Sequence, residues 1–257
     1  MPSARLMALH LVAEQKMFWR NPPAAVFTFV FPLIFLAIFP SLMAGEVVGA
    51  PGREMPFIQY FLPNLAAFGV ITACFTNLAI FLCTRRERGI LKRKRGTPVP
   101  AGVLIGGLVG SVLVVAFVLV VVITVAGVLF NDVTFPGRYA ALALYVAAGA
   151  FCFCTLGIAV SAFIPNETAA PAMSQAMLYP ALFISGTFIP VPTDSVLHKV
   201  AGVLPVRHFN DGMLATFDPF GTGHGIVWRH VGALVLWGLI GTAIARWRFR
   251  WEQVGRR

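Results

Sequence analysis

The sequence predicts an all-α integral membrane protein with six transmembrane helices, an N-terminal interfacial helix and short re-entrant helices before the sixth span. Composition is the first observation: of 257 residues, 58% are hydrophobic and 12% are charged, and the mean hydropathy is +0.81. The second is a series of charge-free stretches long enough to cross a bilayer. The third is the position of the 20 Lys and Arg residues, most of which lie between those stretches.

The spans follow from their lengths, because a bilayer core about 30 Å thick requires about 20 helical residues. The run at 24–44 exceeds the roughly 7–15 apolar residues of a signal peptide, so we expect it to remain as an anchor. The sixth span, 226–245, requires Arg229 to extend its side chain to the interface. The five charge-free spans are 24–44, 57–83, 102–130, 139–164 and 168–192.

Two further segments complete a single transmembrane domain over residues 1–257. Residues 193–225 are too long and apolar for a tight turn, and we expect short helices there that dip partway into the outer leaflet. Residues 4–20 carry an apolar stripe at helical spacing, which predicts a helix in the cytoplasmic interface. Its apolar positions are Leu6, Leu9, Ala13 and Met17.

Charge placement predicts the orientation in the cell membrane. With six spans, the N-terminal segment, residues 85–95 and the C-terminal tail share one side, which carries 15 of the 20 Lys and Arg residues. We therefore expect both termini in the cytoplasm. The formal net charge of +10 could suggest nucleic acid, but the basic residues do not lie on an aromatic-studded polar face, so no nucleic-acid partner is expected.

Motifs for catalysis and for ion coupling are missing from the sequence. It contains no Gly-Lys dipeptide and hence no G-x-x-x-x-G-K-[ST] phosphate loop, and no G-x-S-x-G or H-E-x-x-H motif. The five charge-free spans contain no Asp, Glu, Lys, Arg or His, which argues against proton-driven antiport and a charged-ring channel. Asn64, Asn77 and Gln175 are candidate substrate-pathway residues, although such groups more often join helices.

The regularly spaced glycines, the cysteines and the outer histidines are predicted to have structural roles. Gly102, Gly106 and Gly110 recur every four residues in the third span, a spacing that permits close helix packing, within the chain rather than between copies. The four cysteines predict neither a disulfide nor a metal site. A zinc site among the outer histidines is open, but without an H-x-x-x-H pair exposed or interface-anchoring roles are favoured. These are His198, His208, His224 and His230.

The segment 83–100, "CTRRERGILKRKRGTPVP", packs seven Lys or Arg residues and one Glu into the eleven positions 85–95. One interpretation is a topology signal that also attracts anionic lipid. The inserted Glu87, the flexible Gly89 and the apolar pair Ile90 and Leu91, expected to be exposed, instead suit the docking of a protein.

This segment resembles the cytoplasmic signature of ABC type-2 transporter permeases, and is closest to the bacterial branch that includes daunorubicin-resistance permeases. Three other stretches agree in order: "WRNPPAAVFTFVFPLIF", "FISGTFIP" and "LPVRHFNDGM". The matching residues of the signature are Glu87, Arg88, Gly89, Leu91, Thr97 and Pro98, with Ile90 between them. The matching outer residues are Ser185, Gly186, Pro190, Pro205 and Asp211.

The resemblance implies half of an ATP-driven exporter. Two such subunits, identical or similar, would pair, and a separate cytoplasmic ATPase that holds ATP and Mg would dock on 4–20 and on the coupling segment 85–98. This chain would bind no cofactor and would not itself be an enzyme. Amphiphilic drugs or lipids would be the cargo, as in multidrug or antibiotic resistance. Two alternatives stay open: a non-transporting anchor that recruits a partner through the basic loop, and a passive channel.

Overall fold

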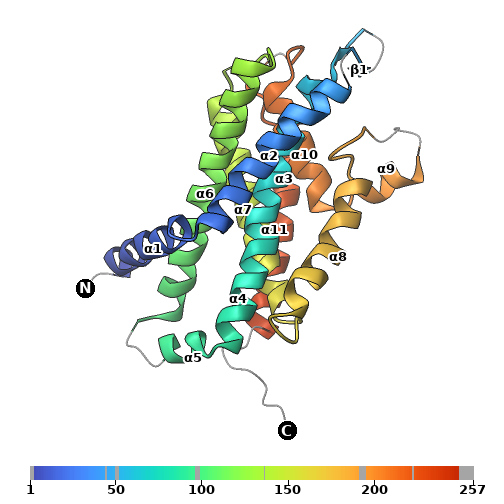
Figure 1. Ribbon diagram of the computed structural model, residues 1–257. Coiled ribbons are helices and arrows are strands. Elements are labelled where there is room, and N and C mark those ends of the chain that lie inside the picture. Colours follow the sequence, from blue (N-terminus) through green and yellow to red (C-terminus); the bar gives the residue numbers. More distant parts are fainter. Residues whose placement is uncertain are drawn as a thin grey trace.

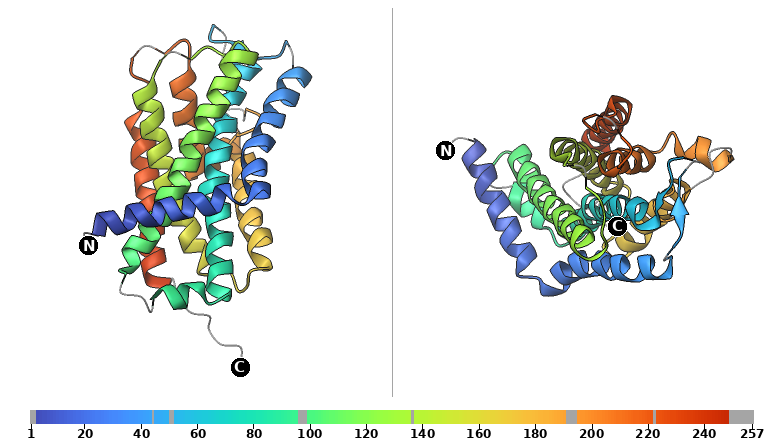
Figure 2. Two further views of the ribbon diagram at one scale, coloured as in Figure 1. Left: turned by 60° about the vertical axis from the view of Figure 1, so that its left-hand side comes forward. Right: turned by 90° about the horizontal axis from the view of Figure 1, so that it is seen from above.

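The chain folds into a helical bundle with one helix lying across it. The computed structural model describes residues 3–43, 45–49, 52–95, 99–135, 137–190, 195–221 and 223–248. The long helices run side by side, whereas α1 (Ser3–Trp19) lies across them (Figures 1 and 2). The other helices are α2 (Pro22–Leu42), α3 (Phe57–Ile71), η1 (Thr72–Asn77), α4 (Leu78–Glu87), α5 (Ile90–Arg95), α6 (Ala101–Phe130), α7 (Tyr139–Ser161), α8 (Ala169–Ile184), α9 (Val196–Ala201), α10 (Pro205–Phe217) and α11 (Trp228–Arg248).

Two short strands interrupt the helical pattern between α2 and α3. Strands β1 (Val47–Val48) and β2 (Met55–Pro56) pair antiparallel, with Val47 opposite Pro56. Within the described residues the sheet has only these two strands, so the molecule remains mostly helical, as predicted.

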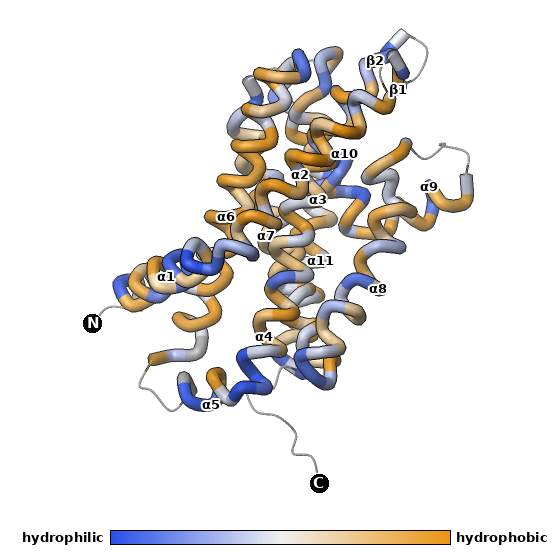
Figure 3. Tube along the Cα trace, in the orientation of Figure 1, coloured by the Kyte–Doolittle hydropathy of each residue, from blue (hydrophilic) through white to orange (hydrophobic). Residues whose placement is uncertain are grey.

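Five helical segments of the described chain are long and apolar enough to span a membrane. They are Ala25–Leu42, Phe57–Glu87, Gly102–Phe130, Tyr139–Ser161 and Trp228–Arg248, and the chain is therefore a multi-pass membrane protein. Figure 3 shows apolar residues along most of their length and polar residues at α5. The second segment continues four residues beyond the predicted limit of Cys83, because Thr84–Glu87 remain helical and Arg85 is buried inside the protein.

The remaining predicted span, 168–192, contains a shorter helix. Helix α8 has 16 residues and ends at Ile184, below the length of about 20 that a bilayer core requires. Gly186 follows with φ of +73°, a backbone conformation that only glycine adopts without strain, so the helix stops. Residues 191–192 lie outside the described chain. A sixth span and re-entrant helices therefore stay predictions.

The core lies along the second span, which is made of α3, η1 and α4. In the apolar, membrane-spanning part of this segment, 78% of the residues are buried inside the protein. In the corresponding part of α2, only 17% are buried. α7 supplies the other central helix, and α11 packs along it where glycines permit close approach. A Cβ on Gly241 would lie 2.9 Å from the backbone nitrogen of Leu156. The second span and α7 thus form the buried centre of the bundle, against which the other helices pack.

Candidate functional site

The base of the molecule is formed by α1, the end of α4, α5 and the turn at residues 162–168. α4 ends at Glu87, and Gly89, with φ of +66°, reverses the chain into α5. A Cβ at Gly89 would meet no atom within 4 Å, so its backbone conformation, not crowding, calls for glycine there. α4 and the first turns of α6 continue past α1, so α5 lies well beyond the level of α1 (Figures 1 and 2).

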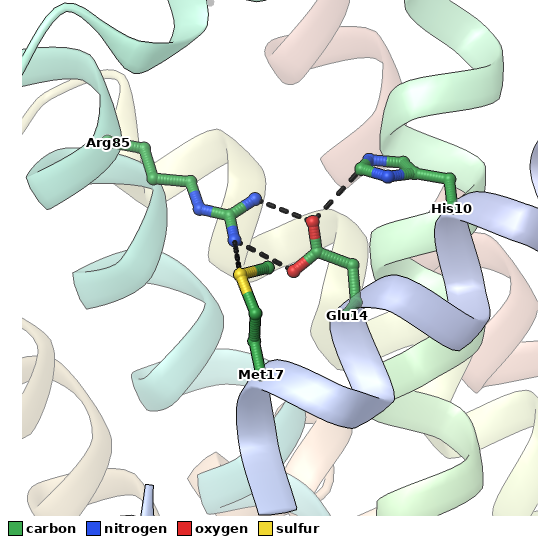
Figure 4. A network of polar contacts seen from close by, with 4 residues as sticks. All are labelled: His10, Glu14, Met17 and Arg85. Atoms are coloured by element: carbon green, nitrogen blue, oxygen red, sulfur yellow. Dashed lines mark hydrogen bonds and ion pairs between the residues drawn. The ribbon is translucent and has the colours of Figure 1, made fainter. Parts of the chain in front are cut away.

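Arg85 fastens α1 to the base of the second span (Figure 4). Its guanidinium donates two hydrogen bonds of 2.8 Å to the two carboxylate oxygens of Glu14, and it lies 3.6 Å from the ring centre of Phe81. His10 Nε2 lies 3.5 Å from the same carboxylate, and Met17 Sδ lies 3.9 Å from Arg85 Nη2. Both charged side chains are buried, so the pair is a structural tie and not a surface charge.

Arg86 and Glu87 bind the turn between α7 and α8. Arg86 Nη1 donates to the carbonyl oxygen of Ser161 at 3.0 Å, and Nη2 donates to that of Ile164. Glu87 Oε2 accepts a hydrogen bond from the backbone N–H of Glu167. The sequence predicted Arg86 only as one of the positive charges and Glu87 as part of a docking core. In the structure both bind within the chain and hold α4 against the 162–168 turn.

Arg88 and α5 present the outward side of the base. Arg88 is exposed and its Nε lies 3.2 Å from a Glu167 carboxylate oxygen, a surface pair of small energetic weight. Lys92 and Arg93 are exposed, and Ile90 is half-buried. Leu91 is only 6% exposed, so the expectation of an exposed Leu91 was wrong: the residue packs into the base. The signature residues Thr97 and Pro98 lie outside the described residues.

The glycine stripe of α6 receives α1. A Cβ on Gly106 would lie 2.7 Å from Met7 Sδ, and one on Gly110 would lie 2.9 Å from a Leu11 methyl carbon. Gly107, which the four-residue spacing missed, lies equally close to His10. Gly106 and Gly110 thus lie against side chains of α1 in the same chain. Gly102, where a Cβ would meet nothing within 4 Å, takes no part.

The predicted outer motifs gather around the end of α8. Tyr60 of α3 donates to the carbonyl oxygen of Gly186. Asn210 of α10 donates to Thr187 Oγ1 at 2.8 Å. These bonds satisfy polar groups beside an irregular stretch of backbone. Ser185 is buried there, and its hydroxyl has no hydrogen-bond partner among the described residues.

Helix α10 carries the other outer motif. Pro205 occupies its first turn, where a missing backbone N–H costs nothing. Asp211 accepts a hydrogen bond of 2.9 Å from Arg207 Nε, one turn earlier. Pro190 lies just after the end of α8 and is partly buried. Arg138, counted in the sequence only as an outer positive charge, donates to the carbonyl oxygen of Ala215 at 2.7 Å and so closes the far end of α10.

The three candidate pathway residues have different surroundings. Asn64 is 1% exposed and donates to the carbonyl oxygen of Tyr60, one turn earlier on α3, at 2.9 Å, which is a structural role. Gln175 is exposed on α8. Asn77 is also exposed and lines a cavity between α1, α2, η1, α4 and α6. The structure therefore does not bring the three together.

The outer histidines form a pair. His208 and His230 place their Nδ1 atoms 3.0 Å apart. Burial lowers the pKa of His208, and the positive charge of Arg229 lowers it further. No group of three or more His, Cys, Asp or Glu residues in the described chain is placed to hold a metal ion.

The fold and the base together define a multi-pass helical membrane protein with a basic segment on one side. A family model described as ABC-2 type transporter matches residues 7–217, from α1 to the last residue of α10. The chain belongs to the ABC-2 type transporter family and is a permease component of an ABC transporter, a class that works with an ABC ATPase subunit. A comparison with curated proteins finds no match.

Proposed function

We propose that this chain is the permease subunit of an exporter that moves amphiphilic drugs or lipids out across the cell membrane. A separate cytoplasmic ATPase supplies the energy from ATP and Mg, and a second copy of the chain or a similar permease completes the pathway. Both termini lie in the cytoplasm, on the side of α5. α8, α9 and α10 make the fifth span and the re-entrant segment before the sixth.

The position and bracing of α5 carry the proposal. α5 lies beyond α1 at the end of the second span, so a soluble partner can reach it. Arg86 and Glu87 tie the end of α4 to the 162–168 turn, and Arg85 ties it to α1. A force applied to α5 is therefore passed to the second span, to α7 and α8, and to α1 at once, which suits a coupling helix.

Uncharged spans support an amphiphilic cargo. The five charge-free stretches contain no ionisable residue other than Tyr and Cys, so a charged hydrophilic substrate would find no buried counter-charge. An amphiphile needs apolar walls and few polar contacts.

The polar contacts around α8 and α10 support the re-entrant segment. Irregular backbone at membrane depth is tolerated only where protein or a wet cavity satisfies its polar groups. Tyr60 donates to the backbone carbonyl oxygen of Gly186, and Asn210 of α10 donates to the side-chain hydroxyl oxygen of Thr187 beside it. This is the support that a segment entering and leaving the same leaflet requires.

Reconstitution tests the exporter against the anchor. A phosphate-loop ATPase should co-purify with the chain, and in liposomes with that ATPase an amphiphile should move only with ATP and should stimulate hydrolysis. Arg93→Glu, on the exposed side of α5, should weaken ATPase binding at least 5-fold. Arg53→Glu, an equal charge reversal between β1 and β2, should leave binding unchanged. A stable complex without any ATP-driven movement would favour the anchor.

A further inference from the structure

A cavity of about 560 Å³ lies beside α1. We call it the α1 cavity. Its volume falls within the roughly 300–1,000 Å³ of sites that bind drug-sized ligands. Most of its wall is apolar and comes from four helices. The apolar residues include Met17 and Phe18 of α1, Phe27 and Phe31 of α2, Phe81 of α4 and Val112 of α6.

The π-helix η1 shapes the polar part of the wall. Thr72, Ala73 and Asn77 all line the cavity, although the first and the last are five residues apart. In an α-helix, residues five apart lie about 140° apart around the axis and face different neighbours. The wider turn of a π-helix brings them closer to one side, and single π-turns often occur at functional sites.

The charge of the cavity is balanced. Among the described residues that line it, Glu14 is the only charged one, and both of its carboxylate oxygens accept hydrogen bonds from Arg85. A ligand with a charged head would therefore meet no free opposite charge there. Asn77, in contrast, is exposed, and its side-chain amide has no hydrogen-bond partner among the described residues. A neutral head that donates and accepts hydrogen bonds complements this wall.

We propose that the α1 cavity binds one single-chain amphiphile with an uncharged, hydrogen-bonding head group, of the monoacylglycerol type, taken from the cytoplasmic leaflet. The acyl chain lies among the aromatic side chains of α2 and α4, and the head contacts Asn77. α1 closes the cavity and is held in place by Arg85. This inference rests on the proposed function, which puts both termini, and with them the N-terminal helix α1, on the cytoplasmic side, and it names where that cargo enters.

The experiment uses a photoreactive monoacylglycerol with the purified full chain in detergent, and mass spectrometry of the labelled peptides. The expected result is one label per chain, on α2, η1, α4 or α6. Monoolein should displace the probe at least 10-fold more effectively than oleic acid or lysophosphatidylcholine. Equal displacement by the charged competitors would overturn the assignment of the head group.

Matched variants locate the site. Val112→Trp fills the cavity and should reduce labelling at least 10-fold, whereas Val114→Trp, on the exposed side of the same helix, should not change it. Asn77→Leu should weaken probe binding at least 3-fold, with Gln175→Leu as the control amide on α8. Gel filtration confirms that each variant is folded. If Val112→Trp does not fold, the comparison of Asn77→Leu with its control Gln175→Leu tests the site instead.

Failure of the α1 cavity as a binding site can be distinguished from failure of the proposed exporter, because ligand binding is measured without the ATPase. Labelling that maps elsewhere, or that ignores both Val112→Trp and Asn77→Leu, would overturn the α1 cavity as a site even if ATP-driven export is intact. Labelling of the cavity by a chain that never engages an ATPase would support the site and overturn the proposed exporter.

Discussion

Replacement of Glu14 with alanine tests whether the pair with Arg85 fixes α1 to the second span. The side chains of Arg85 and Glu14 are only 9% and 3% exposed, so loss of the carboxylate leaves the Arg85 guanidinium buried without a charged partner. Arg85 would lose two hydrogen bonds of 2.8 Å and keep the ring of Phe81 and the distant Met17 sulfur. Removal of one partner of a buried ion pair costs about 3–5 kcal/mol, which is the loss expected here.

The paired replacement should cost far less. Glu14→Met with Arg85→Met removes both charges and leaves apolar side chains of similar length in an apolar setting. Such exchanges are commonly neutral, or stabilising by about 1–4 kcal/mol. We expect the double variant within about 1 kcal/mol of the parent, so the two single losses must be strongly non-additive.

Denaturant titration of the purified chain in detergent, followed by the loss of helical circular dichroism, measures these values. Gln15→Ala is the control on the same helix, since it removes hydrogen bonds of 2.7 and 3.1 Å to Ser111 and an exposed one of 3.1 Å from Trp19 but leaves no charge unpaired. It should cost about 1 kcal/mol. A Glu14→Ala loss no larger than that of Gln15→Ala, or a double variant that costs the sum of its two singles, would contradict a buried ion pair that fixes α1.

Three further predictions concern packing, coupling and pH. Gly107→Leu should destabilise the chain by about 1–3 kcal/mol through overpacking against α1, while Gly102→Leu should not; thermal midpoints in detergent decide. Glu87→Ala should lower substrate-stimulated ATP hydrolysis several-fold more than Lys94→Ala, and equal mild losses would contradict it. Because burial lowers the pKa of His208, the unfolded chain takes up that proton first, so stability should fall as pH drops below about 6.5, less so in His208→Gln.

Hydropathy located the spans because it depends on local composition. Phe57–Glu87 and Gly102–Phe130 are long, apolar and helical, and little outside each segment was needed to find them. The stretch 168–192 is just as free of charge, yet its helix ends at Ile184. The stop depends on the backbone of Gly186 and on its partner Tyr60, 126 residues away in sequence. A hydropathy average over neighbouring residues contains no information on the backbone conformation of Gly186 or on its contact with Tyr60.

The basic cluster shows the same limit at the candidate site. From the sequence, only Arg88 of the seven cations was distinguished, as part of the docking signature with Glu87 and Gly89. Arg85 finds its partner 71 residues earlier on α1, and Arg86 finds its partners 75 and 78 residues later. The signal available in the sequence was Glu14, the single acidic residue of α1, set beside the apolar stripe. Its partner could not be chosen among seven cations without the fold.

The contact of Glu87 changes what its substitution can mean. Its carboxylate accepts the backbone N–H of Glu167, so the residue positions α5 from within the chain. Glu87→Gln keeps an oxygen that accepts this hydrogen bond but removes the charge. If Glu87 acts by positioning, Glu87→Gln should retain most of the ATPase coupling that Glu87→Ala loses, at unchanged stability of the 162–168 turn in hydrogen exchange. If glutamine fails as badly as alanine while that turn stays protected, the charge itself meets the ATPase.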